Sequence, residues 1–391
     1  MATAEQIAAL YRTRFPAFMR FAFHELHPGQ KLVETPHIDV LTDYLARVAR
    51  GEITRLIINM PPRSLKSFAT SIALPTWLLG KDPTRQIMSV AGTKELTRDF
   101  EAATKALMAS SRCRALFPHL ELDGRPGDLR LAHGGRRISA TVGGTLIGRG
   151  ADLIVIDDPI APARVHDTAS RNSVKKWFDA EVIQRLNDKN TGAVIVVMQR
   201  LHVDDLSGHL LGGEQPWVHL NMPAIAMADE RWERSDGRVY LREKGQALAP
   251  DIEGRRQLFE RMLDIGAYNF GAQYQQAPFR NMNDEEVRGG CFAGPDDEWG
   301  FPSMWFGKVR ETAIMAHEVF GVGDHNPAAP ARRMTMEEFE RYGRWTEDYQ
   351  RRLQDHPHAQ FGPPAGETWP PDQNAPPPPA RKPSVEDEFI E

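Results

Sequence analysis

The chain has 391 residues, with 48 Lys and Arg against 53 Asp and Glu and a formal net charge of -5. Apolar residues make up 41% of it, which is typical of a globular protein and excludes disorder throughout. Two cysteines, Cys113 and Cys291, cannot staple a chain of this length, which excludes a disulfide scaffold and favours a reducing compartment. The mild acidity excludes a protein coated in basic charge, although nucleic acid needs only a local basic patch.

The chain carries no pattern typical of a membrane or secreted protein. No apolar run approaches the roughly 18–20 residues that span a bilayer. The first 20 residues contain Glu5, Arg12 and Arg14, which do not fit a signal peptide. We therefore expect no membrane segment and no membrane partner.

The predicted elements alternate between helix and strand along most of the chain. Leu41, Leu45 and Val48 recur at helical spacing, and Gly51 is a suitable end for an N-terminal helical region. The predicted strands are Arg55–Asn59, Gln86–Val90, Leu129–Ala132, Arg137–Val142, Leu153–Ile156, Ala193–Met198 and Trp217–Met222. Helices are predicted from Ser67 to about Leu79 and at Leu96–Met108, Ser170–Leu186 and Asp204–Leu211. Continuous apolar strands alternating with helices indicate an α/β fold with a mostly parallel sheet covered on both faces.

The character of the chain changes after this region. Helices are predicted at Arg255–Ile265 and Tyr268–Gln276, and residues 363–383 hold nine prolines in 21 positions. The expected organisation is a helical segment at 1–50, an α/β core at 51–225, a helical linker at 226–280, an irregular or short helical region at 281–362 and a disordered Pro-rich acidic tail at 363–391.

A phosphate-binding turn is predicted between the first strand and the following helix. P-loop proteins place the pattern G-x-x-x-x-G-K-[ST] at such a junction. Lys66 and Ser67 match its end, whereas Met60 and Leu65 stand at the two glycine positions. On these residues alone, the alternative is a proline-capped helix start with a lysine in solvent.

The backbone of this turn still supplies donors for a phosphate. Pro61 and Pro62 have no N–H, so the donors are amides at the start of the next helix, where the helix dipole favours an anion. These amides belong to Arg63, Ser64, Leu65, Lys66 and Ser67. We expect Lys66 to reach the β- and γ-phosphates of ATP and the Ser67 hydroxyl to hold Mg²⁺.

A second half of the same site is predicted where the apolar run Leu153–Ile156 is followed by two carboxylates. Ligands of open α/β sheets bind at the carboxyl ends of the strands. We expect Asp157 to hold Mg²⁺ and Asp158 to orient and polarise the attacking water. Gln199, at the end of a neighbouring strand, is expected to respond to the γ-phosphate. A plain turn before Pro159 and a polar strand exit are the alternatives.

Five segments, in chain order, resemble the large terminase subunit of tailed bacteriophages and related prophages. They are Ile58–Ser67, Gly144–Gly150, Leu153–Pro159, Val196–Leu206 and Ala272–Pro278, and Pro36–His37 ahead of a helix also matches. The resemblance covers about residues 30–280. It implies a P-loop ATPase of the additional-strand type that uses ATP and Mg²⁺ to package double-stranded DNA into a procapsid.

The resemblance also implies partners, a location and residue roles. The partners are the portal protein, a small terminase subunit and further copies of the chain in a ring, in the cytoplasm of a bacterial host at the procapsid portal. Arg63 matches the arginine of the family's P-loop, and Arg149 lies where some members supply an arginine to a neighbour's ATP. His37 is implied to lie near the adenine. A backbone-positioning role for Arg149 and a helix-capping role for His37 are the alternatives.

The chain departs from the family in two places. Asp158 stands where many members carry Glu, so its carboxylate is one methylene shorter. Members normally continue with a nuclease domain of RNase H type, which holds two metal ions on strand-borne carboxylates. After Pro278 the acidic residues at 284–286, 296–298 and 324 follow no apolar strand run, so the sequence predicts no working nuclease.

Two other functions are weighed against the packaging ATPase. Another P-loop translocase such as a helicase predicts a second motor-like series of strands and helices after residue 226, which the sequence lacks. An inactive prophage remnant fits the missing nuclease but not the intact Lys66, Ser67, Asp157 and Asp158. For a DNA motor, the candidate phosphate contacts are Arg171, Lys175, Lys176 and Arg185, against the alternative of a solvated charged face.

Overall fold

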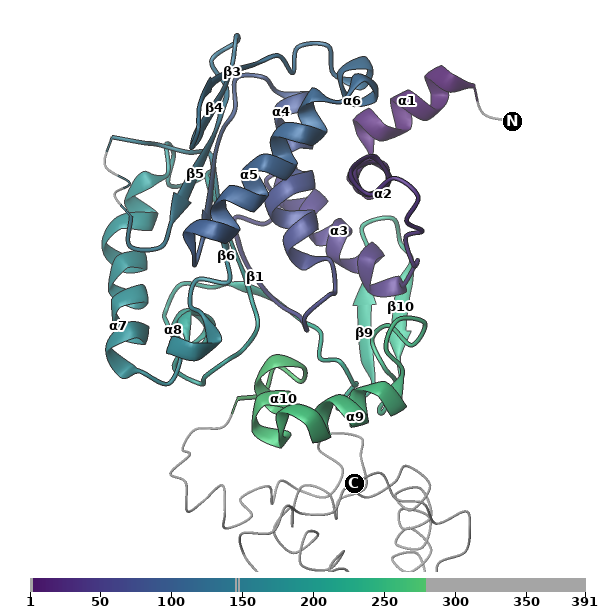
Figure 1. The fold of residues 1–391 in the computed structure, drawn as a ribbon, viewed down its shortest axis with the longest axis vertical. Helices are drawn as coiled ribbons and strands as arrows, with labels where there is room; N and C mark the ends of the chain where they lie inside the picture. The colour runs from purple at the N-terminus through teal and green to yellow at the C-terminus, as the bar shows by residue number, and fades with distance from the viewer. Residues whose placement is uncertain (1–2, 145, 147, 279–391) are drawn as a thin grey trace, which may run out of the picture. The chain divides into compact units, whose positions relative to one another are not determined.

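The computed structural model describes residues 3–144, 146 and 148–278 (Figure 1). The chain divides into a unit at 1–280 and a second at 281–391. The predictions for 281–362 and 363–391, and the prediction that no nuclease is present, therefore lie outside the described residues.

The N-terminal region is helical, as predicted, and consists of three helices. They are α1 (Ala4–Thr13), α2 (Phe15–Leu26) and α3 (Pro36–Ala49). Thr3 and Gln6 form a capping box at the start of α1, and a proline stands in the first turn of both α2 and α3. Gly51, at φ +79°, follows α3 and lets the chain turn into the sheet.

Eight strands of the described chain form one mixed sheet. They are β1 (Arg55–Asn59), β2 (Gln86–Ala91), β3 (Leu122–Arg125), β4 (Asp128–Leu131), β5 (Arg136–Thr141), β6 (Leu153–Asp157), β7 (Ala193–Met198) and β8 (Val218–Asn221), in the order β3-β4-β5-β2-β6-β7-β1-β8. In this spatial order, each neighbouring pair between β5 and β8 is parallel, whereas β3 and β4 add an antiparallel edge. The predicted, mostly parallel α/β sheet is confirmed.

Apolar cores lie on both faces of the sheet because successive side chains of a strand point to opposite faces. Leu56 and Ile58 of β1 join the core beneath the N-terminal helices, whereas Ile57 joins the core on the other face. The helices of the first core are the π-helical segment Phe68–Ala73, α4 (Leu74–Lys81), α5 (Lys94–Ala109) and α6 (Ser111–Leu116) with α2 and α3. Those of the second are α7 (Thr168–Trp177) and α8 (Leu206–Leu211), on the opposite side of the sheet (Figure 1).

The helix predicted at Ser170–Leu186 changes geometry along its length. After α7 the chain continues as π-helix at Phe178–Val182 and as 3₁₀-helix at Ile183–Arg185. Val174, Trp177 and Val182 stay buried through these changes, so the apolar face predicted from the sequence packs on the sheet as expected.

The region after β8 contains more than the predicted helices. The strands β9 (Glu230–Glu233) and β10 (Val239–Arg242) form an antiparallel hairpin, followed by α9 (Arg255–Ile265) and α10 (Ala267–Gln273). The prediction that Trp217–Met222 is the last strand is wrong. Exposed and at least partly buried residues alternate along both strands, and Trp232 stacks on Tyr240, so the hairpin lacks the long apolar run used to predict buried strands.

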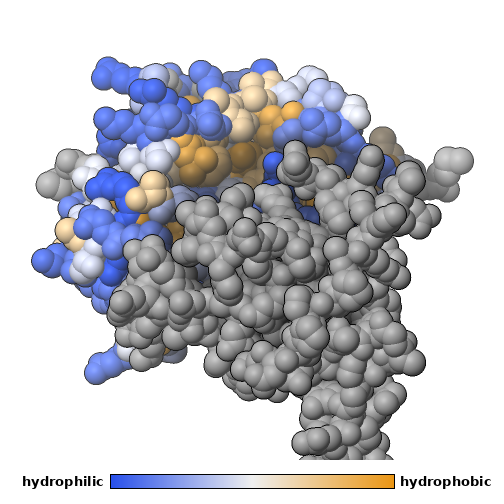
Figure 2. All heavy atoms as spheres, turned by 60° about the horizontal axis from the view of Figure 1, so that its bottom comes forward, coloured by the Kyte–Doolittle hydropathy of each residue, from blue (hydrophilic) through white to orange (hydrophobic). Residues whose placement is uncertain are grey.

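The described surface in the space-filling view is mostly hydrophilic, with an apolar area between two hydrophilic margins (Figure 2). Exposed large apolar side chains of the described residues are spread over several elements; they are Ile7, Leu10, Val33, Leu211, Val218, Val239, Leu241 and Ile252. Among the described helices, none has both the length and the apolar character needed to cross a membrane.

Candidate nucleotide site

The predicted phosphate-binding turn follows the carboxyl end of β1, and its backbone conformation is unusual. Arg63 and Leu65 both adopt left-handed conformations, at φ +60° and +61°. Such a conformation costs a non-glycine residue about 1–2 kcal/mol. Leu65 stands at a glycine position of the usual pattern, so the turn keeps the glycine-like backbone without the glycine. The partly buried Leu65 side chain packs against the apolar core, which offsets part of this cost.

The backbone amides of this turn lie at the start of the following helix. The N–H groups of Ser64, Leu65 and Lys66 donate to no acceptor within the described part of the chain. Free N–H groups at a helix N-terminus form a site for an anion. The Ser64 hydroxyl instead donates to the Pro61 carbonyl at 2.8 Å, which fixes the turn.

Lys66 points to the predicted carboxylates. Its side chain is 6% exposed, and its Nζ lies 3.4 Å from Oδ2 of Asp158. This distance is short enough for an ion pair between the two side chains. The two halves of the site that the sequence predicts separately therefore lie next to one another.

Asp157 is completely buried and is held by two hydroxyls of the helix that follows the turn. Oδ1 accepts a hydrogen bond from Ser67 at 2.9 Å, and Oδ2 accepts one from Ser71 at 2.5 Å. Burial, followed by the neighbouring Asp158 carboxylate, raises the pKa of Asp157 to about 7, against the lowering effect of Lys66 and the two hydroxyls. Sequence reasoning missed Ser71, although it lies four residues after Ser67 and so on the same helix face.

Asp158 lies at φ +41°, immediately beyond β6. Its Oδ1 accepts a hydrogen bond from the Gln199 backbone N–H at 3.3 Å. The neighbouring Gly92 is pressed against this turn, since a Cβ on Gly92 would lie 2.2 Å from the Asp158 carbonyl oxygen. The carboxylate is thus placed by backbone contacts from the ends of β2 and β7.

The sheet order explains why these groups meet. β7 pairs with β6 on one side and with β1 on the other, so one strand separates the turn-bearing strand from the strand that ends in Asp157. The predicted additional-strand arrangement is confirmed. Gln199 follows β7, which neighbours the Asp157 strand as predicted and also lies between the two halves of the site. Its Oε1 is buried and has no hydrogen-bond partner among the described residues, so it offers an unsatisfied acceptor.

The end of β7 is also tied to α10 through the segment Ala272–Pro278. The Arg200 backbone N–H donates to Oε1 of Gln276 at 2.9 Å. Gln275 pairs with both backbone groups of Ile225, accepting at 2.8 Å and donating at 3.1 Å. The sequence singled out this segment by resemblance but did not predict these contacts, which join residues far apart in the chain.

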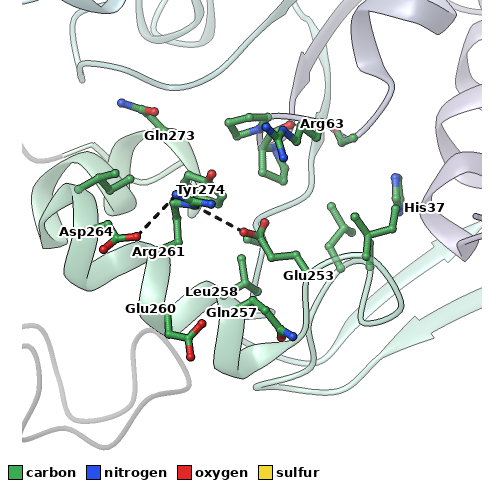
Figure 3. Close-up of a pocket in the computed structure, with 18 residues that line it drawn as sticks. His37, Arg63, Glu253, Gln257, Leu258, Glu260, Arg261, Asp264, Gln273 and Tyr274 are labelled. Atoms are coloured by element: carbon green, nitrogen blue, oxygen red, sulfur yellow. Dashed lines mark hydrogen bonds and ion pairs between the residues drawn. The ribbon is translucent and has the colours of Figure 1, made fainter. Parts of the chain in front are cut away.

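A pocket of about 550 Å³ opens beside the phosphate-binding turn, within the usual size range of small-molecule sites. Figure 3 shows His37 and Arg63 on one side and the side chains of α9 and α10 on the other. The Arg261 guanidinium lies between two carboxylates, 3.8 Å from Glu253 and 3.7 Å from Asp264. The pocket therefore continues the phosphate site towards the α9–α10 region.

His37 lines this pocket and is almost completely buried. Burial lowers its pKa to about 4, so the imidazole is neutral at pH 7. Neither ring nitrogen makes a hydrogen bond of ordinary geometry with a described residue, although the Ser64 and Leu248 backbones lie near enough to act on its charge.

Some predicted residues are not brought to this site. Arg149 lies exposed between β5 and β6, and within the described residues its side chain makes no hydrogen bond or ion pair. Arg171 is only 8% exposed and donates to the Val165 carbonyl at 2.7 Å, and Lys175 is paired with Asp204 at 2.7 Å. Arg185 also donates to the Glu181 carbonyl, at 3.3 Å, so three of the four predicted DNA contacts are engaged within the protein.

No protein-family model and no curated protein matches the chain. Solved structures similar to it include the HK97 bacteriophage large terminase, at 17% identity over 55% of this chain and 44% of that one, with a TM-score of 0.38. The large terminase ATPase domain of Thermus phage P74-26 matches at 13% identity over 66% and 97%, with a TM-score of 0.39. A third similar structure is the large terminase of a thermophilic bacteriophage in complex with ADP. Its sequence identity is 7% over 59% of this chain and 51% of that one, with a TM-score of 0.31. The chain spans less than half of the HK97 protein, and all three are phage large terminases, the family that the five sequence segments resemble.

Proposed function

We propose that the chain is the motor subunit of a phage DNA-packaging terminase, which hydrolyses ATP to move double-stranded DNA. The observation that carries this proposal is the cluster at the carboxyl edge of the sheet, where Lys66 lies 3.4 Å from Asp158 and Ser67 donates to Asp157. A basic group, a pair of carboxylates and a set of unpaired amides at one helix start are the parts that phosphoryl transfer to water requires.

Lys66 and Asp158 are expected to separate when ATP binds. The Lys66 ammonium would leave the carboxylate for the β- and γ-phosphates, joined by the free amides of Ser64 and Leu65. Asp158 would then be free to accept a hydrogen bond from water and orient it towards the γ-phosphate. Gln199 has an unsatisfied Oε1 beside Asp158 and is placed to take part in positioning that water.

The residues around Asp157 fit a magnesium ion. Mg²⁺ prefers oxygen ligands, and Ser67 and Asp157 present a hydroxyl and a carboxylate 2.9 Å apart. When bound, the ion would neutralise phosphate charge during hydrolysis.

The adjoining pocket is the proposed site of the base and ribose. His37 and the backbone of the turn form one wall, and α9 and α10 form the other (Figure 3). A neutral His37 offers both an N–H donor and an acceptor, which suits the edge of a purine.

The proposal extends to partners that follow from the resemblance. They are the portal protein, a small terminase subunit and a homo-oligomeric ring at the portal in a bacterial cytoplasm. The exposed Arg149, without a partner in the described chain, is proposed to act on the ATP of a neighbouring copy. Arg63 is exposed in the turn and lines the pocket, so it is proposed to contact the nucleotide of its own chain.

The test is Mg²⁺-dependent ATP hydrolysis by the full chain, with and without linear double-stranded DNA. Wild type is compared with Lys66→Ala and Asp158→Asn. We expect DNA to raise wild-type turnover, Lys66→Ala to abolish nucleotide binding and turnover, and Asp158→Asn to bind ATP without hydrolysing it. Unchanged turnover in Lys66→Ala would overturn the phosphate-site assignment.

Two further results would point to the competing functions. ATP-dependent separation of duplex strands would favour a helicase. Failure of the wild type to bind ATP at all would favour an inactive remnant, since such a result cannot come from a motor that waits only for its partners.

A further inference from the structure

The helix α5 presents three cations on one side. Lys94, Arg98 and Lys105 are exposed and follow one another at spacings of four and seven residues, which places them on one side of the helix. Their side chains make no hydrogen bond or ion pair with another described residue. Over eleven residues, at about 1.5 Å per residue, this face is about 16 Å long.

A groove of about 420 Å³ lies beside these three cations. α5 packs against β5 and β3, and the groove is lined by residues of α5, of β5 and of the turn after β3. Its other lining residues are mostly small or polar and include Thr97, Ser139, Thr141 and Gly127. Hydroxyls and cations together are the groups that contact phosphate oxygens in nucleic-acid complexes.

The one acidic residue that lines the groove, Glu101, is bonded to the backbone of the groove wall. The Glu101 carboxylate accepts the Gly127 backbone N–H at 2.8 and 3.0 Å. It also acts electrostatically on Arg137, which is fully buried and carries its own positive charge. The charge of Glu101 is thus partly balanced inside the protein, and the groove keeps a net positive charge in a chain whose net charge is -5.

We propose that this groove binds the phosphate backbone of double-stranded DNA, which rests on the proposed function as a DNA motor. Three cations along about 16 Å of helix span successive phosphates of one strand. The contacts would be insensitive to sequence, because the groove offers cations and hydroxyls to phosphate. The α7 helix is a poorer candidate, since its Arg171 and Lys175 are already bonded within the protein.

A short series of contacts joins the groove to the nucleotide site. Arg137 donates to Ser139 Oγ in the groove at 2.6 Å and to the Ser71 carbonyl at 3.2 Å. Ser71 in turn donates to Asp157 at 2.5 Å. DNA in the groove would therefore lie a few contacts from the proposed magnesium ligand, which gives a physical route for DNA to alter ATP turnover.

The test measures binding of a fluorescent linear duplex to the full chain as salt rises from about 50 to 200 mM. The variant Lys94→Ala/Arg98→Ala/Lys105→Ala is expected to bind about tenfold more weakly and to lower the slope of log Kd against log salt by about two to three. The matched control Lys176→Ala/Arg185→Ala/Lys189→Ala removes the same charge from the α7 side and is expected to bind as wild type does. Unchanged thermal melting and unchanged ATPase without DNA would show that both variants fold.

Several outcomes would overturn the groove. An equal loss in both variants would show a general charge effect, and no loss in the α5 variant would place the DNA elsewhere while the motor proposal stands. Failure of the wild type to bind duplex would overturn the proposed DNA-binding role of the groove. The proposed ATPase activity is tested separately, by turnover without DNA. Equally tight binding to phosphatidylserine vesicles, lost in the α5 variant, would identify a membrane surface as the partner.

Discussion

Leu65 shows that a backbone conformation, rather than a particular amino acid, defines the phosphate-binding turn. At φ +61° it carries out the task that glycine performs in the usual pattern. In the sequence, Leu65 reads as a mismatch to the P-loop pattern, because a sequence shows the residue type and not its φ angle. The match of Lys66 and Ser67 is therefore the better guide to the site.

Substitutions at Leu65 separate conformation from packing. Leu65→Gly is expected to retain ATP turnover and to change the free energy of unfolding by no more than about 1 kcal/mol, because relief of the left-handed strain offsets the lost apolar contact. Leu65→Val is expected to lose turnover and stability, since a β-branched residue fits this φ poorly. Urea unfolding and steady-state ATPase measure both effects. Equal behaviour of the two variants would show that the turn does not depend on this conformation.

His37 makes the stability of the protein depend on pH. Its pKa is about 4 in the folded chain against 6.5 when exposed, so between these values the unfolded chain binds a proton that the folded chain does not. Stability therefore falls as pH drops from 6.5 to about 4, by up to about 3 kcal/mol for this residue. His219 has a lowered pKa of about 4 as well and adds to the loss.

The variant His37→Leu tests this dependence. It is expected to lose less stability than wild type across the same pH window, with the contribution of His219 left in place. The measurement is urea unfolding at several pH values between about 4 and 7. Parallel curves for variant and wild type would mean that His37 is not kept neutral by burial.

At the scale of elements, the segment Ala272–Pro278 fastens α10 to two places in the α/β core. Gln276 holds the Arg200 amide at the exit of β7, next to the amide of Gln199 that binds Asp158. Gln275 bonds to the backbone of Ile225 instead, far along the chain from Asp158. The two glutamines therefore form a matched pair, of which one supports the site and the other supports only the docking of the helix.

This pair gives a prediction about turnover. Gln276→Ala leaves the Arg200 N–H without an acceptor, at a cost of about 1–3 kcal/mol, and is expected to lower kcat about tenfold with a smaller change in KM. Gln276→Glu keeps an acceptor oxygen and is expected to recover part of the loss. Gln275→Ala should lower the Tm more than it lowers kcat. A comparable fall of kcat in both alanine variants would contradict a positioning role for Gln276.

Elements were predictable from sequence where burial on both faces gave an unbroken apolar run. β6 and β7 match their predictions to within one residue for this reason. β9 and β10 were missed because exposed residues alternate with at least partly buried ones, such as Glu230 and Trp232, in a short hairpin. This hairpin is stabilised by tertiary packing. The π-helical turns were also missed, since they arise from packing and not from the identity of residues.

The site was predictable only in part, for a related reason. Lys66, Ser67, Asp157 and Asp158 lie at element ends that the order of strands brings together, and order can be inferred from sequence. Ser71 and Gln276 gain their roles from contacts across the fold, which no local pattern encodes. The residue roles themselves stay predictions until turnover is measured.

At the scale of the whole molecule, nucleotide binding should stabilise the folded chain. A ligand at about 100 times its Kd raises the free energy of unfolding by about 2.7 kcal/mol. We expect ADP with Mg²⁺ to raise the Tm of wild type, and Lys66→Ala to show no such rise. Thermal melting over a series of ADP concentrations is the measurement. A rise of equal size in the variant would place the nucleotide away from the turn.

Gly92 is a position where the fold around Asp158 accepts only glycine. Its missing side chain leaves the space that the Asp158 carbonyl occupies, so any other amino acid would displace the strand end that carries the carboxylate. In a saturation library selected for activity, this position should therefore admit no replacement, even though it lacks any group that could touch a nucleotide. Intolerance there would come from crowding of main chain against main chain. A map of lost function would then mark a residue that takes no part in the chemistry, directly after β2, a strand that β6 and β7 separate from the strand leading into the phosphate-binding turn.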